Sequence, residues 1–157
     1  MTLREKLRTD QMANYRFKRT VPEAALKADV LSNVNGLIST EEKSGKNPVE
    51  FTDEKVLEFL TKQVKTRRDT AALYAEQGVT ERAERETAEA DFLATYLPAQ
   101  LDESEVEKIV DEAIAGLPEG VEGKRAIGVV MKVVTPQTKN RADGGAVSAL
   151  VRSKLGL

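Results

Sequence analysis

Apolar side chains recur at steps of three and four residues through most of the sequence, and they do not alternate with polar ones over any useful length. The clearest run is Leu26, Val30, Val34 and Ile38, which would share one face of a helix. A half-buried strand would instead show a period of two. The pattern therefore predicts an all-α protein.

Capping signals divide the first part of the chain. Thr2 with Glu5, and Thr20 with Glu23, each fit a capping box, in which the hydroxyl and the carboxylate satisfy backbone N–H groups at a helix start. Thr52 is expected to cap a third helix. The acids that follow it also indicate a helix start, because the positive end of the helix dipole favours them. Helices are predicted at about 3–18, 21–43, 53–77 and 81–97.

A boundary is predicted where Leu97 meets Pro98, because the residue before a proline is pushed out of the helical region. Asp102 with Glu105 then gives a new capping box. Three shorter helices are expected to follow: one from Asp102 to about Gly116, one ending at Thr135 and Pro136, and one beginning behind Asp143-Gly144-Gly145. The predicted architecture is an N-terminal four-helix subdomain (1–97) packed with a C-terminal three-helix subdomain (98–157).

The composition of the chain excludes several classes of catalytic and binding site. The 157 residues include neither cysteine nor histidine, which excludes disulfides, thiolate metal sites and histidine-based catalysis. Lys and Arg (24) nearly balance Asp and Glu (26), so the strongly basic field of a dedicated nucleic-acid binder is missing. No uncharged apolar run is long enough for a membrane span or signal peptide. We expect a cytoplasmic protein that uses no cofactor or metal and does not associate with a membrane.

Two groups of cations are candidate phosphate contacts. The first is Lys62, Lys65, Arg67 and Arg68 on the predicted third helix, where a row of cations would face an RNA backbone. Because charge runs on helices are usually solvated and Glu58 precedes Lys62 by four residues, the plain solvated face is the favoured reading of this group.

The second group lies in the C-terminal subdomain, where phosphate contacts would position an RNA without reading its sequence. The competing reading is that the last two cations only suit the negative end of the final helix. The two readings stay open. The residues are Lys132, Lys139, Arg141, Arg152 and Lys154.

Three other patterns have simpler explanations. Asp143-Gly144-Gly145 lacks the Lys-Ser/Thr of a phosphate-binding loop, and its aspartate would repel an anion, so a helix cap is favoured. The acids between Glu81 and Asp91 lack the histidines that carboxylate metal sites in helical bundles use. The aromatic residues at helical spacing are expected in the core rather than stacking on bases: Phe59, Tyr74, Phe92 and Tyr96.

Several strings, in order, resemble the YqeY family, whose members are similar to the C-terminal helical and tail region of GatB, a subunit of the tRNA-dependent amidotransferase. The resemblance implies two helical subdomains and kinship with a part of that enzyme that touches tRNA rather than performing its chemistry. The strings are 62–69 (KQVKTRRD), 90–91 (AD), 96–101 (YLPAQL), 128–132 (GVVMK) and 141–151 (RADGGAVSALV).

Three functions follow as hypotheses. The first is an accessory protein that binds tRNA or another RNA and has no catalytic centre of its own. The second is an adaptor bundle that docks a protein partner through an exposed apolar stripe. The third is a carbon–nitrogen ligase function, with glutamine as amido donor, exercised in complex with an amidotransferase. Autonomous catalysis is not expected, because the resemblance places the nucleophile and the ATP chemistry outside this region.

Overall fold

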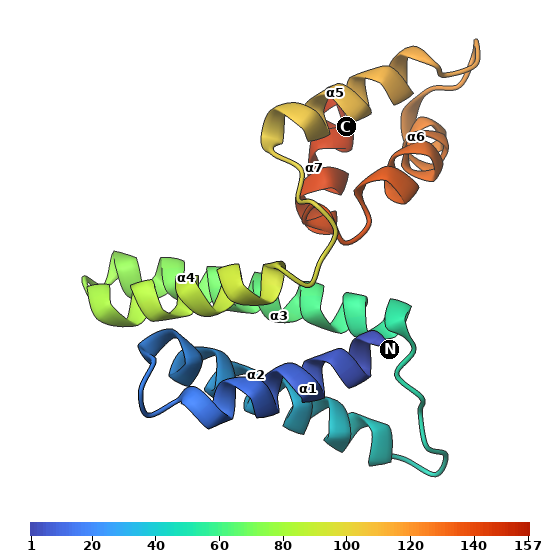
Figure 1. Cartoon of the computed structure of the whole chain (residues 1–157). Helices are drawn as coiled ribbons and strands as arrows, with labels where there is room; N and C mark the ends of the chain where they lie inside the picture. Colours follow the sequence, from blue (N-terminus) through green and yellow to red (C-terminus); the bar gives the residue numbers. More distant parts are fainter. The chain divides into compact units, whose positions relative to one another are not determined.

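A computed structural model describes residues 1–157 and consists of seven α-helices without strands (Figure 1). The all-α prediction and the division into four and then three helices are confirmed. Contacts group the chain into two compact units, Met1–Tyr96 and Leu97–Leu157. The helices are α1 (Leu3–Phe17), α2 (Pro22–Lys43), α3 (Asp53–Glu76), α4 (Thr80–Ala94), α5 (Glu103–Ala115), α6 (Gly123–Thr138) and α7 (Gly144–Lys154).

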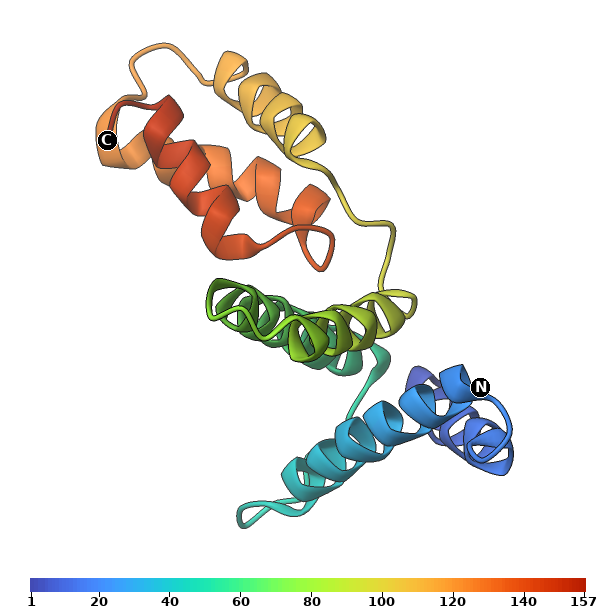
Figure 2. The same ribbon diagram turned by 90° about the vertical axis from the view of Figure 1, so that its left-hand side faces the viewer.

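The first unit is built from two helix pairs. α1 lies along α2, and α4 lies along α3, as both views show (Figures 1 and 2). The pairs meet where α1 contacts α3 and where α2 contacts α4. Burying each leucine or isoleucine contributes roughly 1.5–3 kcal/mol, so the apolar stripes hold the unit together. Its largest fully buried side chains are Leu7, Leu31, Ile38, Leu60 and Leu93.

The starts of α1 and α3 follow from their caps. Thr2 and Glu5 form the predicted capping box, and the Thr52 hydroxyl accepts from the backbone N–H of Lys55. Asp53 also reaches α1, where its Oδ1 accepts from the N–H of Leu3 at 2.8 Å. A carboxylate therefore lies at the positive end of α1, where the helix dipole favours it.

The predicted capping box at Thr20 and Glu23 is wrong. The Thr20 hydroxyl donates to the carbonyl of Phe17 at 3.2 Å, which closes the end of α1. Val21 is the N-cap of α2 and makes no side-chain cap. Pro22 takes the first helical position, where its missing N–H costs no helical hydrogen bond. A local hydrogen bond from the hydroxyl to a carbonyl thus forms in place of the N-cap.

The second unit packs α5, α6 and α7 around a valine-rich core (Figure 1). Asp102 and Glu105 form the predicted capping box at the start of α5. The segment before α5 is tied to the loop before α7, because the N–H of Leu101 donates to the carbonyl of Arg141 at 2.8 Å. The buried core residues are Val106, Val110, Ala113, Val130, Val134, Val147 and Val151.

α6 does not end at Thr135 and Pro136 as predicted. Pro136 lies inside the helix, which continues to Thr138. The proline removes one hydrogen bond, but it is exposed, whereas Thr138 is buried and its hydroxyl donates to the carbonyl of Val134 at 3.1 Å. Burial of Thr138 therefore helps to carry the helix past the proline.

Candidate nucleic-acid interface

The α3 group of cations does not form one exposed row. Lys62, Lys65 and Arg68 are exposed, but Arg67 is buried, with 9% of its surface accessible. Arg67 Nε donates to Glu89 on α4 at 3.2 Å, and its Nη2 donates to Asn33 on α2 at 3.1 Å. The assignment of Arg67 as a phosphate contact is therefore corrected, because this guanidinium is committed to joining three helices.

The exposed members of the α3 group lie among acids. Lys65 pairs with Asp69 at 3.4 Å, and Arg68 Nη1 pairs with Asp91 at 3.1 Å. α3 and α4 together carry ten carboxylates and seven cationic side chains. A phosphate approaching this surface would meet an overall negative field, which weakens its attraction.

Charge is divided between the helices of the second unit. α5 carries five carboxylates and one lysine. α6 carries three cations, Lys124, Arg125 and Lys132, and no acid, and α7 carries Arg152 and Lys154 without an acid. The cationic surface of this unit therefore belongs to α6 and α7.

One face of α6 presents cations at a regular interval. Arg125 and Lys132 are seven residues apart, so they lie on one side of the helix with a step of about 10 Å, and Lys139, seven residues further on, is the C-cap of the helix. All three are exposed. Gly128 lies between the first two, three residues after Arg125 and four before Lys132. A Cβ built on Gly128 would meet no atom within 4 Å, so the packing of this unit does not require a glycine there.

The other candidate cations of this unit differ in how strongly they interact with other groups of the protein. Lys154 pairs with Glu107 at 2.7 Å and with Asp111 at 3.0 Å, and the hydrogen bond that its ammonium donates to Glu107 is the main reason why the Lys154 pKa is raised. Arg141 donates from Nε to the carbonyl of Ala99 at 3.0 Å, which fastens the loop before α7. Arg152 is exposed at the end of α7.

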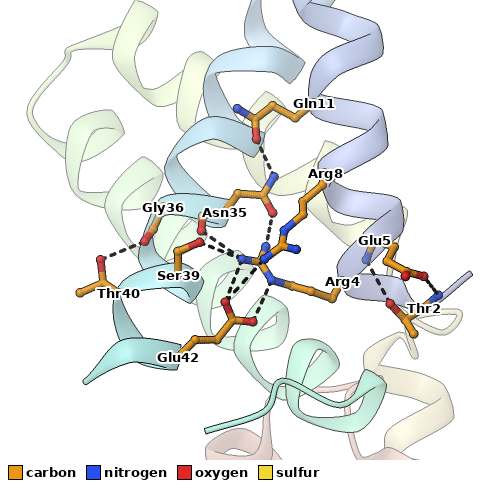
Figure 3. A network of polar contacts seen from close by, with 10 residues as sticks. All are labelled: Thr2, Arg4, Glu5, Arg8, Gln11, Asn35, Gly36, Ser39, Thr40 and Glu42. Carbon is orange, nitrogen blue, oxygen red and sulfur yellow. Dashed lines mark hydrogen bonds and ion pairs between the residues drawn. The ribbon is translucent and has the colours of Figure 1, made fainter. Parts of the chain in front are cut away.

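The most connected polar cluster of the protein is structural. Arg4 is buried and donates from Nε to Glu42 at 3.1 Å and from Nη2 to Ser39 at 2.9 Å, as Figure 3 shows. Asn35 accepts from Arg4 and donates to Gln11 at 2.7 Å. No buried side-chain polar atom of the protein lacks a partner. This cluster joins α1 to α2 and presents no unpaired reactive group.

Two cationic features were not among the sequence-based candidates. Arg125 belongs to the α6 row, and its seven-residue spacing from Lys132 is visible in the sequence. The first 20 residues hold six basic and two acidic side chains. The composition of that stretch is a signal by itself, but only the structure shows which of its cations are buried.

The structure also shows where the other candidate residues from the sequence lie. Asp143 is the N-cap of α7, and its Oδ1 accepts from the N–H of Gly145 at 3.2 Å. The aromatic rings of Phe92 and Tyr96 are only partly buried and pack edge to face, with centroids 5.6 Å apart. No group of carboxylates is arranged to hold a metal ion. None of the seven helices combines the length and apolar character needed to cross a membrane.

Comparison with known proteins shows the family of the chain. The family described as Yqey-like protein matches residues 4–155. The chain belongs to the YqeY family. Among the relatives of this YqeY protein, "Altered inheritance of mitochondria protein 41, mitochondrial" of Komagataella phaffii is 26% identical over 157 residues, covering 93% of this chain and 80% of the relative.

A second relative matches a shorter part of the chain. It is one of the subunits of the glutamyl-tRNA(Gln) amidotransferase of Aeropyrum pernix, and it is 41% identical over 58 residues, which are 36% of this chain. The match covers 9% of the length of that relative. The likeness therefore concerns a short segment of a much larger protein.

Proposed function

We propose that this YqeY protein is an RNA-binding accessory protein, that tRNA is its ligand, and that α6 supplies the main contact surface. The single observation that carries the proposal is the α6 face with Arg125, Lys132 and Lys139 and no acid on the helix. Each cation placed against a phosphate releases condensed counterions, which is the main source of affinity in nonspecific RNA binding. Arg152 on α7 adds a further exposed cation to the same unit.

Gly128 supports the same surface. A glycine inside a helix costs roughly 0.5–1 kcal/mol relative to alanine, and nothing within 4 Å of its missing Cβ compensates for that cost. The absence of a side chain lets a ligand backbone come close to the helix between Arg125 and Lys132. We infer that a sugar-phosphate segment lies over Gly128, with cations on either side of it.

The relatives favour tRNA over other RNAs. One of them belongs to a glutamyl-tRNA(Gln) amidotransferase. Since the match covers 9% of that relative, amidotransferase activity is not carried over to this chain. We assign the protein no catalytic centre of its own, and any carbon–nitrogen ligase role would be exercised in complex with an enzyme that provides the chemistry. Its cytoplasmic location stays a prediction.

The test is tRNA binding by filter retention, with Lys132→Glu as the α6 variant and Lys62→Glu on α3 as the matched control. Both positions are exposed, so neither change should alter the fold, which circular dichroism would check. We expect wild-type protein to bind tRNA at low salt, Lys132→Glu to bind much more weakly, and Lys62→Glu to change little. Equal binding by wild type and Lys132→Glu would contradict the proposal.

A second candidate function, an adaptor for a protein partner, is favoured by one cavity. An open cleft of about 440 Å³ lies beside α5 and α7. Its walls include Leu101, Val106 and Leu150. Its rim carries Glu103, and also Glu107, which pairs with Lys154 at 2.7 Å. An apolar segment flanked by Lys or Arg would complement it. Retention of a protein partner after nuclease treatment of a lysate, lost in a Leu150→Glu variant, would favour this function over RNA binding.

A further inference from the structure

The last turns of α1 and the connection from α1 to α2 carry apolar and cationic side chains that the fold does not use. Figure 1 shows this connection as the blue loop at the end of the helix pair. Every residue from Tyr15 to Glu23 is exposed. We call the hairpin tip the six residues that present large apolar or cationic side chains there: Met12, Tyr15, Arg16, Phe17, Lys18 and Arg19.

The apolar members of the hairpin tip are unusually open. Met12 is 65% exposed, Tyr15 63% and Phe17 57%. The buried residues of α1, Arg4 and Leu7, lie in the first half of the helix, whereas these three side chains lie in its second half. A protein gains nothing for its own fold by exposing three such side chains within six residues of the chain, which is typical of a contact surface.

The backbone of the hairpin tip is ordered by hydrogen bonds. The N–H groups of Thr20 and Val21 both donate to the carbonyl of Phe17, at 3.0 and 2.9 Å. The Thr20 hydroxyl donates to the same carbonyl. The exposed rings are therefore held on a defined turn, so binding would cost little backbone entropy.

The charge of the hairpin tip selects an anionic ligand. Arg16, Lys18 and Arg19 are all exposed, and none of the six residues is an acid. The Lys18 ammonium lies 4.9 Å from the centroid of the Tyr15 ring and 4.0 Å from Asp29 of α2, so the two arginines are the cations left for a ligand. Aromatic faces beside cations are the combination that binds unpaired nucleotides, with rings for the bases and cations for the phosphates.

We propose that the hairpin tip is a second RNA-binding site, which stacks unpaired bases on Tyr15 and Phe17 while Arg16 and Arg19 contact the adjoining phosphates. The inference rests on the proposed function in taking RNA as the ligand. It adds a single-stranded element to the recognition, in a different unit from α6. Anionic membranes also attract apolar and cationic side chains, but lipid binding scales with the apolar area that is buried, and three apolar side chains offer little of it.

The test is the binding of a labelled 12-nucleotide oligouridylate, measured by fluorescence anisotropy at low salt. The variant is Tyr15→Ser with Phe17→Ser, which keeps every charge, and the matched control is Leu73→Ser, an exposed apolar residue of α3. We expect the double variant to lose at least about fivefold in affinity, the least that stacking of one base contributes. The control should bind like wild type, and all three proteins should unfold at similar urea concentrations.

The outcomes separate this site from the α6 surface. tRNA binding that needs Lys132 but not Tyr15 and Phe17, together with equal oligouridylate binding by wild type and double variant, would overturn the hairpin tip and leave the proposed function standing. Oligouridylate binding lost in the double variant, with no effect of Lys132→Glu on tRNA, would support the tip and defeat the α6 surface. Ring-dependent binding to phosphatidylglycerol vesicles without oligouridylate binding would also overturn the proposal, in favour of a lipid surface.

Discussion

The phenolic hydroxyl of Tyr96 donates a hydrogen bond to Oδ2 of Asp10 at 2.6 Å, which joins the end of the first unit to its first helix. The same carboxylate oxygen accepts from Lys6 at 3.1 Å, and the Lys6 ammonium lies 5.6 Å from the centroid of the Tyr96 ring. Burial raises the pKa of the Tyr96 hydroxyl well above its usual value, and the hydrogen bond to Asp10 raises it further. The neutral hydroxyl is therefore part of the folded state.

The change Tyr96→Phe removes this hydroxyl while keeping the ring. We expect the free energy of unfolding to fall by about 1–2 kcal/mol at neutral pH, because the lost hydrogen bond has a charged partner and is partly buried. Because the folded pKa is raised, the wild-type advantage is complete below the unfolded pKa of about 10 and declines as the pH rises above it. Urea unfolding at about pH 7 and about pH 11 measures both effects. An equal difference at the two pH values would contradict this role.

Glu42 gives a pH dependence of the opposite sign. The hydrogen bonds from Arg4 hold the pKa of the Glu42 carboxyl below its ordinary value, and the charges of Arg4 and Arg8 act in the same direction. A lowered folded pKa contributes stability above the unfolded pKa of about 4.3, and this contribution is lost as the pH falls through the folded pKa.

We therefore expect Glu42→Gln to destabilise the protein by about 1–3 kcal/mol at neutral pH, because the buried Arg4 guanidinium loses its charged partner. The difference from wild type should shrink as the pH falls below the unfolded pKa of about 4.3 and through the lowered folded pKa. Urea titrations across that range measure it. The exposed change Glu84→Gln, on the surface of α4 beyond its first turn, serves as the control and should show no such trend. A constant difference for Glu42→Gln at all pH values would contradict the account of the Arg4 cluster.

The change Gly128→Ala should affect stability and tRNA binding in opposite directions. Because the new Cβ meets no atom within 4 Å and α6 continues on both sides, we expect the free energy of unfolding to rise by about 0.5–1 kcal/mol. tRNA affinity should fall, because the methyl group occupies the space that the ligand backbone needs. Thermal unfolding and filter binding on the same preparation measure the two effects. Gly36→Ala, on α2 and equally open, should stabilise without changing tRNA affinity. Unchanged binding by Gly128→Ala would remove the glycine from the interface.

The sequence predicted those parts of the fold that depend on neighbours along the chain. The capping boxes at Thr2 and Asp102 need only residues three positions apart, and both are present. The box at Thr20 failed because an equally local bond to the carbonyl of Phe17 competed with it. The predicted end of α6 at Pro136 was wrong for a different reason. Thr138, in the turn that continues the helix, is buried, and that burial depends on tertiary packing.

The candidate site was harder to predict because exposure of a cation is a tertiary property. Arg67 looks equivalent to Arg68 in the sequence, but only Arg67 points toward Glu89 of α4. The seven-residue spacing of Arg125 from Lys132 is visible in the sequence, but only the structure shows that both side chains are exposed. The open rings of the hairpin tip, such as Phe17, look in sequence like ordinary core residues.

The most direct test of the central claim is the salt dependence of tRNA binding by wild type, by Arg125→Gln with Lys132→Gln, and by the α3 control Lys62→Gln with Lys65→Gln. If the two α6 cations contact phosphates, their loss should reduce the slope of log affinity against log salt by about 1.4–1.8, and the control should keep the wild-type slope. Wild-type protein that fails to bind tRNA at low salt, or an α6 variant with the wild-type slope, would contradict the account.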